Sequence, residues 1–106
     1  MHISRDGQVV TLINVFETTP EGQQALIDSW IAFVEAVSGE TDLIAAALHR
    51  SRDGTRVINY AQWRSEAAYG RFVEQYSEQF AARLPLASRV DPHLYEVVYL
   101  YDRAGD

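Results

Sequence analysis

The chain has 106 residues, of which 47% are hydrophobic and 11% are aromatic, and it carries a formal net charge of −6. One domain with one core is therefore expected, a disordered chain is excluded, and the lack of a basic surface argues against nucleic acid and membranes as partners. No cysteine is present, so disulfide and thiolate chemistry are excluded, and with no apolar leader or bilayer-length apolar run we expect a cytoplasmic location.

The first part of the chain predicts a strand followed by a helix. Residues 8–17 alternate in a way that places apolar side chains on both faces of a strand. Thr19 is the expected N-cap and Pro20 the first position of a helix that runs to about Val37, because apolar residues recur there at spacings of three and four. A strand that is apolar on both faces is expected to be covered on both faces.

The middle of the chain predicts a β-hairpin. Residues 41–51 and 56–63 have the composition of strands. Asp53 and Gly54 between them form a favoured two-residue turn. Two antiparallel strands are therefore expected to flank this turn.

The last third predicts a second helix and a final strand. Ser65 is the expected cap of a helix that ends near Pro85, and residues 93–101 alternate tyrosines with aliphatic residues as a strand does. The order strand, helix, strand, strand, helix, strand predicts a single α+β, ferredoxin-like (βαββαβ) domain over residues 1–106, with its core at about 8–101 and flexible termini.

Two helices on one face of an antiparallel sheet leave the other face without a cover. Because the strands carry apolar side chains on both faces, we expect the second face to pack against another copy of the chain. The expected assembly is a homodimer, in which the two subunits form a dimeric α/β barrel.

An asparagine interrupts the strand at residues 56–63. Asn59 is disfavoured by strand propensity, and strand alternation places it on the same face as Val57, Ala61 and Trp63. A carboxamide and an indole N–H would then project into one space beside an apolar wall, as in many small-molecule pockets. The alternatives are an amide bonded to backbone or to a partner subunit, and a tryptophan that only fills the core.

The second helix carries an aromatic stripe and a cation on the same side. Such a stripe fills a core more often than it lines a ligand site, and its members are Tyr69, Phe72, Tyr76 and Phe80. Arg83 follows on the same side, about four turns after Tyr69, where a cation needs a partner. It either caps the C-terminus of the helix or forms an anion site that faces the cavity.

A histidine is expected close to Asn59 in the hairpin. Positions paired across the turn sum to about 107, so His49 is expected opposite Ile58 and within one residue of Asn59, although an edge histidine is more often solvated. Asn14 in the first strand is a further candidate for a buried amide. The three histidines lack metal-site spacing and no phosphate-binding or nucleophile motif is present, so no metal or other cofactor is expected.

The Asn-Tyr-Ala-Gln-Trp segment at residues 59–63, with the Ser-Glu helix start at residues 65–66, resembles the antibiotic biosynthesis monooxygenase family. It is most similar to the small quinone-forming monooxygenases of aromatic polyketide pathways, and the resemblance covers residues 8–101. The resemblance implies a dimeric ferredoxin-like enzyme that oxidises a polycyclic, anthrone-type phenol to a quinone with O₂ as co-substrate and without flavin, metal or haem. It also suggests that the last strand crosses to the partner subunit.

The resemblance also implies roles for particular residues. The expected catalytic residues are Asn59, Trp63, Tyr69 and Arg83, and the expected substrate-binding residues are His49, Phe72 and Tyr76. Of the second set, His49 matches a pocket-lining position of the family, whereas the two aromatic residues belong to the stripe on the second helix.

Other functions stay open at this point. A polyketide aromatase or cyclase would use a similar apolar pocket, and a non-catalytic small-molecule-binding dimer would use Asn59 for a structural hydrogen bond with no cavity beside it. Haem-degrading relatives bind iron through a histidine on the second helix, and this chain has no histidine between Trp63 and Leu84. Haem degradation is therefore disfavoured, although Asn14 resembles an asparagine of those relatives.

Overall fold

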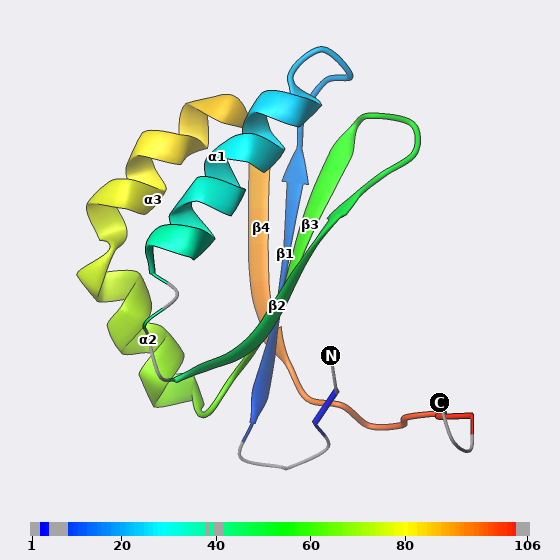
Figure 1. The fold of residues 1–106 in the computed structure, drawn as a ribbon, viewed down its shortest axis with the longest axis vertical. Coiled ribbons are helices and arrows are strands. Elements are labelled where there is room, and N and C mark those ends of the chain that lie inside the picture. Colours follow the sequence, from blue (N-terminus) through cyan, green and yellow to red (C-terminus); the bar gives the residue numbers. More distant parts are fainter. Residues whose placement is uncertain (1–2, 5–8, 38, 40–41, 104–106) are drawn as a thin grey trace.

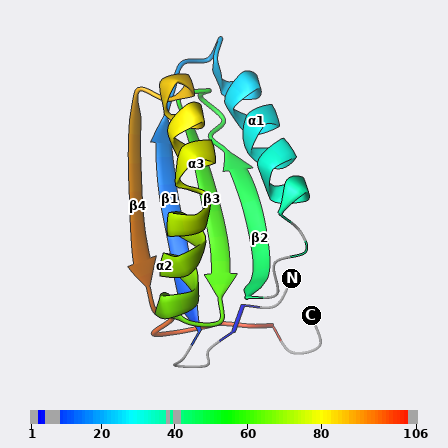
Figure 2. The ribbon, with the colours of Figure 1, turned by 90° about the vertical axis from the view of Figure 1, so that its left-hand side faces the viewer.

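The protein forms one antiparallel sheet with all of its described helices on one face (Figures 1 and 2). The computed structural model describes residues 3–4, 9–37, 39 and 42–103. The elements in chain order are β1 (Val10–Glu17), α1 (Gln23–Ala36), β2 (Leu43–Arg50), β3 (Arg56–Trp63), α2 (Glu66–Gln75), α3 (Ser77–Arg83), the 3₁₀ turn η1 (Leu84–Leu86) and β4 (Arg89–Tyr95). The strand order is β2-β3-β1-β4, which confirms the ferredoxin-like prediction.

The core lies between the sheet and the helices. Alternate residues of the two central strands face the helices, and among them Phe16 and Val57 are almost fully buried. The helical spacing of the apolar residues in α1 brings Trp30 and Phe33 against this face, with the Phe16 and Trp30 ring centroids 5.0 Å apart. In the described ranges, no helix is long and apolar enough to cross a bilayer.

Helix α1 begins three residues later than predicted. Its N-cap is Gly22, whose N–H donates to the carbonyl and the hydroxyl of Thr19, at 3.0 Å and 3.1 Å, in a turn before the helix. The prediction of Thr19 as N-cap is therefore wrong. The turn lets Gln23 reach the hairpin, where its Nε2 donates to the carbonyls of Ser51 (3.1 Å) and Arg56 (2.9 Å).

The hairpin of β2 and β3 has the predicted register and a longer loop. His49 lies opposite Ile58, as predicted. The loop occupies residues 52–55 rather than two residues, because the last backbone bond before it runs from the Ser51 N–H to the Arg56 carbonyl. The prediction of a two-residue turn is wrong, although both loops give the same pairing.

The segment after the hairpin starts as predicted and ends in a different form. The Ser65 hydroxyl accepts a hydrogen bond from the Ala68 N–H at 3.0 Å and caps α2. The predicted single helix is divided at Tyr76, where the backbone has φ −108° and ψ 24°, and Pro85 lies in the 3₁₀ turn that follows α3. Among the described residues, three α-helices thus lie on one face of the sheet instead of the two predicted.

The division at Tyr76 has a packing reason. Phe72 and Phe80 are separated by eight residues, which corresponds to about 12 Å along a straight helix. Their ring centroids are nevertheless 5.8 Å apart, and they lie 5.9 Å and 5.2 Å from the ring of Phe33. Two helical segments with a bend between them allow both rings to pack on the same residue of α1.

The last strand lies earlier in the chain than predicted. It occupies Arg89–Tyr95 rather than residues 93–101. The hydrogen-bonded pairing of β4 with β1 ends where Tyr95 lies opposite Thr11. Residues 96–101, which were predicted to continue the strand, pair with no described strand. Pro92 is tolerated because β4 is an edge strand, on which a missing backbone N–H is not required.

The second face of the sheet has no described helix against it. It carries half-buried apolar residues of the central strands, among them Ile13, Val15 and Ile58. The chain after β4 runs away from the sheet (Figure 1) and exposes Val98 by 86% and Tyr99 by 76%. The described sheet is open, and the dimeric barrel stays a prediction.

Candidate functional site

Two adjoining cavities lie between the sheet and the helices. They share Asn14, Trp30, Tyr69 and Phe80 as lining residues, so we treat them as the inner and outer lobes of one pocket. The inner lobe has a volume of about 50 Å³ and the outer lobe about 200 Å³. The inner lobe is lined further by Asn59 and Trp63, and the outer lobe by Arg83.

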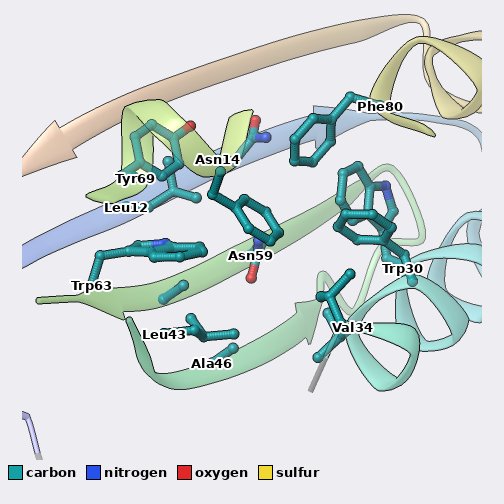
Figure 3. Close-up of a pocket in the computed structure, with 14 residues that line it drawn as sticks. Leu12, Asn14, Trp30, Val34, Leu43, Ala46, Asn59, Trp63, Tyr69 and Phe80 are labelled. Carbon is teal, nitrogen blue, oxygen red and sulfur yellow. The ribbon is translucent and has the colours of Figure 1, made fainter. Parts of the chain in front are cut away.

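Strand β3 places its predicted residues on the wall of the inner lobe. Asn59, Ala61 and Trp63 all line it, as strand alternation predicts. Ala61 lies opposite Ala46 of β2, and these two small side chains leave space between the amide and the indole. In Figure 3, Asn59 lies between Trp63 at one end of the pocket and Trp30 at the other.

The inner lobe collects buried polar atoms that have no hydrogen-bond partner within the protein. In the described part of the chain, four buried side-chain nitrogen or oxygen atoms lack a partner, and the residues that carry them all line this lobe: Asn14 (Oδ1), Trp30 (Nε1), Asn59 (Oδ1) and Trp63 (Nε1). A buried polar atom without a partner costs about 1–3 kcal/mol, so such atoms are rare in stable proteins. Four of them around one cavity indicate a site arranged for a ligand that carries both acceptors and donors.

The two asparagines form a pair across neighbouring strands. Asn14 of β1 lies directly opposite Asn59 of β3, on the face that the helices cover. Side chains in such positions have Cβ atoms about 4.5–5.5 Å apart. Rotation about χ2 exchanges the oxygen and nitrogen of each amide, so the pair can accept hydrogen bonds from a phenol or donate them to an oxyanion.

Tyr69 of α2 lies on the wall that the two lobes share. Its ring contacts the ring of Trp63 edge-on, with centroids 5.7 Å apart. Burial raises the pKa of the Tyr69 phenol above its ordinary value of 10.0. The hydroxyl therefore keeps its proton at neutral pH and can act as a hydrogen-bond donor in the pocket.

The aromatic stripe divides between the pocket and the core. Phe72 lines the inner lobe, with its ring 4.6 Å from that of Trp63. Tyr76 lines neither lobe; its ring packs on those of Phe33 and Phe72, at 5.7 Å and 4.8 Å. The structure therefore places Phe72 on the wall of the inner lobe and Tyr76 outside both lobes, partly buried against the core. The substrate-binding role of each stays a prediction.

Arg83 combines the two roles that its sequence position allowed. Its Nη1 donates to the carbonyl of Gln79 at 2.9 Å, and its Nε donates to the carbonyl of Ser29 on α1 at 3.3 Å. The guanidinium also lies over the ring of Phe33, 4.8 Å from its centroid, and over that of Trp30 at 5.9 Å. The side chain thus caps the end of α3 and also faces the outer lobe.

His49 lies outside this pocket. Because it pairs with Ile58, its side chain belongs to the opposite face of the sheet from Asn59. There it lines a separate cavity with Ala47 and Tyr60, so the described chain does not bring it into the pocket of Asn59. Its role in substrate binding stays a prediction. Across the described residues, no group of three His, Cys, Asp or Glu side chains is arranged to hold a metal ion.

Trp30 is the pocket residue that the sequence pattern did not single out. The pattern places it only on the apolar face of the first helix. The available signal was its indole N–H, a hydrogen-bond donor that needs an acceptor when it is buried, as the indole of Trp63 does. The neighbours of Trp30 on the same face of the helix are apolar and offer no side-chain acceptor. Two tryptophans at opposite ends therefore define the long direction of the inner lobe (Figure 3).

Comparison with known proteins identifies relatives of the chain. Tetracenomycin-F1 monooxygenase of Streptomyces glaucescens is 43% identical over 68 residues, which cover 63% of this chain and 61% of that relative. The match thus spans less than two thirds of the relative's length.

Solved structures share the fold. The monooxygenase from the gene ActVA-Orf6 of Streptomyces coelicolor, solved with nanaomycin D, has a TM-score of 0.67 and 24% identity over 92% of this chain and 93% of its own. SnoaB of Streptomyces nogalater, a cofactor-independent oxygenase, has a TM-score of 0.70 and 19% identity over 92% of this chain and 100% of its own. At these identities the likeness concerns the fold alone. The sequence profile of antibiotic biosynthesis monooxygenases matches residues 9–83, and the chain therefore belongs to this family.

Proposed function

We propose that this protein is a cofactor-independent monooxygenase that oxidises a polycyclic, anthrone-type phenol to a quinone with O₂. The observation that carries the proposal is the set of four unpartnered polar atoms around one apolar lobe, on a chain of the antibiotic biosynthesis monooxygenase family. Its relatives include a tetracenomycin-F1 monooxygenase and an oxygenase described as cofactor-independent.

In this reaction the substrate supplies the electrons. Loss of a proton from its acidic C–H group gives a delocalised enolate, which passes one electron to O₂. Recombination of the two radicals forms a C–O bond and leaves a peroxide anion. Protonation of this anion, loss of the second C–H proton and cleavage of the O–O bond release water and form the quinone carbonyl.

The pocket residues stabilise the charge that develops in these steps. Asn59 and Trp63 donate hydrogen bonds to the enolate oxygen, a contribution of about 3–4 kcal/mol for a well-placed donor. Tyr69, whose pKa is raised by burial, gives a proton to the peroxide anion. Arg83 adds positive potential from the outer lobe, and water takes the substrate proton, because His49 lies on the other face of the sheet.

The proposal includes a homodimer in the cytoplasm. The apolar second face of the sheet and the exposed tail after β4 offer the surface for a second copy. The chain has no cysteine and so needs no oxidising compartment.

Incubation of purified, metal-free protein with an anthrone and O₂ tests the reaction. The protein is expected to accelerate quinone formation over the spontaneous rate, and Asn59→Ala to reduce kcat by about 10²–10³-fold. Tyr60→Phe is the control, because Tyr60 is the next residue of β3 and lies on the opposite face. No acceleration by the unmodified protein would contradict the proposal.

An aromatase or cyclase would use the same pocket without consuming O₂. Oxygen uptake in the same assay separates the two classes. A non-catalytic binding protein is disfavoured, because Asn59 lines a cavity and its Oδ1 has no partner in the described chain.

A further inference from the structure

We propose that the outer lobe is a recognition site for a carboxylate, carried by the aromatic substrate at the end remote from its reacting ring. The inference rests on the proposed function for the identity of the reacting ring. It concerns a different part of the pocket, where Arg83 is the only charged residue among the described residues that line the lobe. Three observations support it.

The first observation is the size of the two lobes. Pockets that hold organic ligands have volumes of about 300–1,000 Å³. The inner lobe of about 50 Å³ has space for a few water molecules, so a polycyclic ligand with one ring at Asn59 must extend into the outer lobe of about 200 Å³. The remote end of such a ligand therefore meets the outer-lobe residues.

The second observation is the direction of the pocket. Trp63 and Trp30 lie at the two ends of the inner lobe, with Asn59 between them (Figure 3). Trp30 also lines the outer lobe. The guanidinium of Arg83 is stacked over the ring of Trp30, so the cation lies at the end away from Trp63. A ligand that places its reacting ring beside Asn59 and Trp63 points its other end toward Arg83.

The third observation is the state of the Arg83 guanidinium. Two carbonyl oxygens and two aromatic rings hold it in place, but these groups use only two of its five N–H donors. Within the described residues it has no acidic partner; the ion pairs there that involve arginine use Arg64, Arg71 and Arg89. A half-buried guanidinium with free N–H donors and no acidic partner can bind an anion through charge-assisted hydrogen bonds.

The lining of the lobe favours a carboxylate as that anion. Apart from Arg83, the lobe presents mainly apolar walls, including Val73, Leu84 and Val90. One planar guanidinium matches the two oxygens of a carboxylate, and apolar walls suit the ring that carries it. Because the whole chain has a net charge of −6, an acidic ligand is not attracted over long range, and its recognition depends on this local cation.

Binding of two matched quinones tests the inference without turnover. The probes are an anthraquinone with a carboxylate on a terminal ring and the same anthraquinone with a methyl group there, and quenching of tryptophan fluorescence reports their Kd values. The protein is expected to bind the carboxylate form about tenfold or more tightly. Arg83→Gln is expected to abolish this preference and Arg83→Lys to retain part of it. Arg52→Gln, which removes the same charge from the exposed hairpin loop, is expected to keep it.

The experiment has clear opposing outcomes. Equal affinities in the unmodified protein, or a preference that survives in Arg83→Gln, would overturn the inference. If Arg83→Gln fails to fold by circular dichroism, titration of the unmodified protein with salt gives the answer, because only the carboxylate form should bind more weakly as salt rises. Failure of the protein to oxidise an anthrone would remove the proposed function and leave this binding preference intact, so the two failures are distinguishable.

Discussion

At the scale of single residues, strand alternation carried most of the information about the site. It placed Asn59 and Trp63 on one face, and both line the inner lobe. The same rule, applied across the predicted register, places His49 on the face of Ile58 and away from Asn59. The position of Trp30 on the apolar face of α1 did not distinguish it from a core tryptophan, and its indole N–H was the one signal, because the cavity beside it depends on how α2 and α3 pack.

The proton on Tyr69 leads to a prediction at this scale. Tyr69→Phe keeps the ring contact with Trp63 and removes the hydroxyl, so quinone formation is expected to slow by about 10²-fold or more. Burial raises the pKa of Tyr69 above 10.0. The contribution of the buried, neutral Tyr69 to the free energy of unfolding is therefore fully present below pH 10, and it is lost as the pH rises through the raised pKa of the folded protein.

The pH dependence of kcat checks this assignment. Between pH 7 and about 10, ionisation of Tyr69 should cause no loss of rate in the unmodified protein. A decline with a midpoint well below pH 10 that disappears in Tyr69→Phe would contradict it.

At the scale of elements, local sequence signals predicted the existence of each helix and strand more accurately than its bounds. β3 has its predicted bounds, and Ser65 caps its helix. Long-range contacts set the other bounds. Gln23 bonds the hairpin at the start of α1, and Phe33 packs on the rings of Phe72 and Phe80 on either side of the break at Tyr76. Pairing with β1 fixes the position of β4, which ends at Tyr95. A sequence pattern within one window contains none of these contacts.

The hairpin loop illustrates how local hydrogen bonds fix an element. The Asp53 carboxylate accepts hydrogen bonds from the Thr55 hydroxyl (2.7 Å) and N–H (2.9 Å) and from the Ser51 hydroxyl (2.8 Å). These bonds, with the Thr55 hydroxyl as the largest cause, lower the pKa of Asp53 to about 2. Their stabilising contribution is present above the ordinary pKa of 3.8 and is lost as the pH falls through about 2.

Two glycines give a matched prediction about stability. Gly54 has φ +82°, and a Cβ there would lie 3.1 Å from Cα and Cβ of Pro20, so Gly54→Ala is expected to lower the free energy of unfolding by about 1–2 kcal/mol or more. Gly70 lies in α2, where a Cβ would have no neighbouring atom within 4 Å, so Gly70→Ala should raise it by about 0.5–1 kcal/mol. Urea unfolding measures both, and effects of the same sign would contradict this account of the two backbones.

At the scale of the whole molecule, the fold follows from the order of its elements, whereas the assembly does not. The open sheet presents an apolar second face, and the tail after β4 exposes large side chains. Exposed apolar residues so close together are typical of surfaces that another chain covers. The sequence alone could not show whether the tail joins its own sheet, because its alternating tyrosines fit any strand.

The tail provides the test of the proposed dimer. Sedimentation velocity is expected to give twice the 12.0 kDa chain mass. A double variant with Val98→Ser and Tyr99→Ser should raise the dissociation constant about tenfold or more, because both side chains lose apolar burial. Ile31→Ser changes a residue that is 42% exposed on α1 and should leave the dimer intact. A monomer at micromolar concentration of the unmodified protein would contradict the dimer.

In the proposed reaction, the pocket directs one atom of O₂ into a phenolic substrate, with the electrons supplied by the substrate. Turnover of an anthrone by metal-free protein under ¹⁸O₂, followed by mass spectrometry of the product and by an oxygen electrode, tests it most directly. One labelled oxygen atom in each quinone and one O₂ consumed per quinone are expected, at a rate above that of the spontaneous reaction. Oxygen uptake at the spontaneous rate, or a faster reaction whose product carries no label, would contradict it.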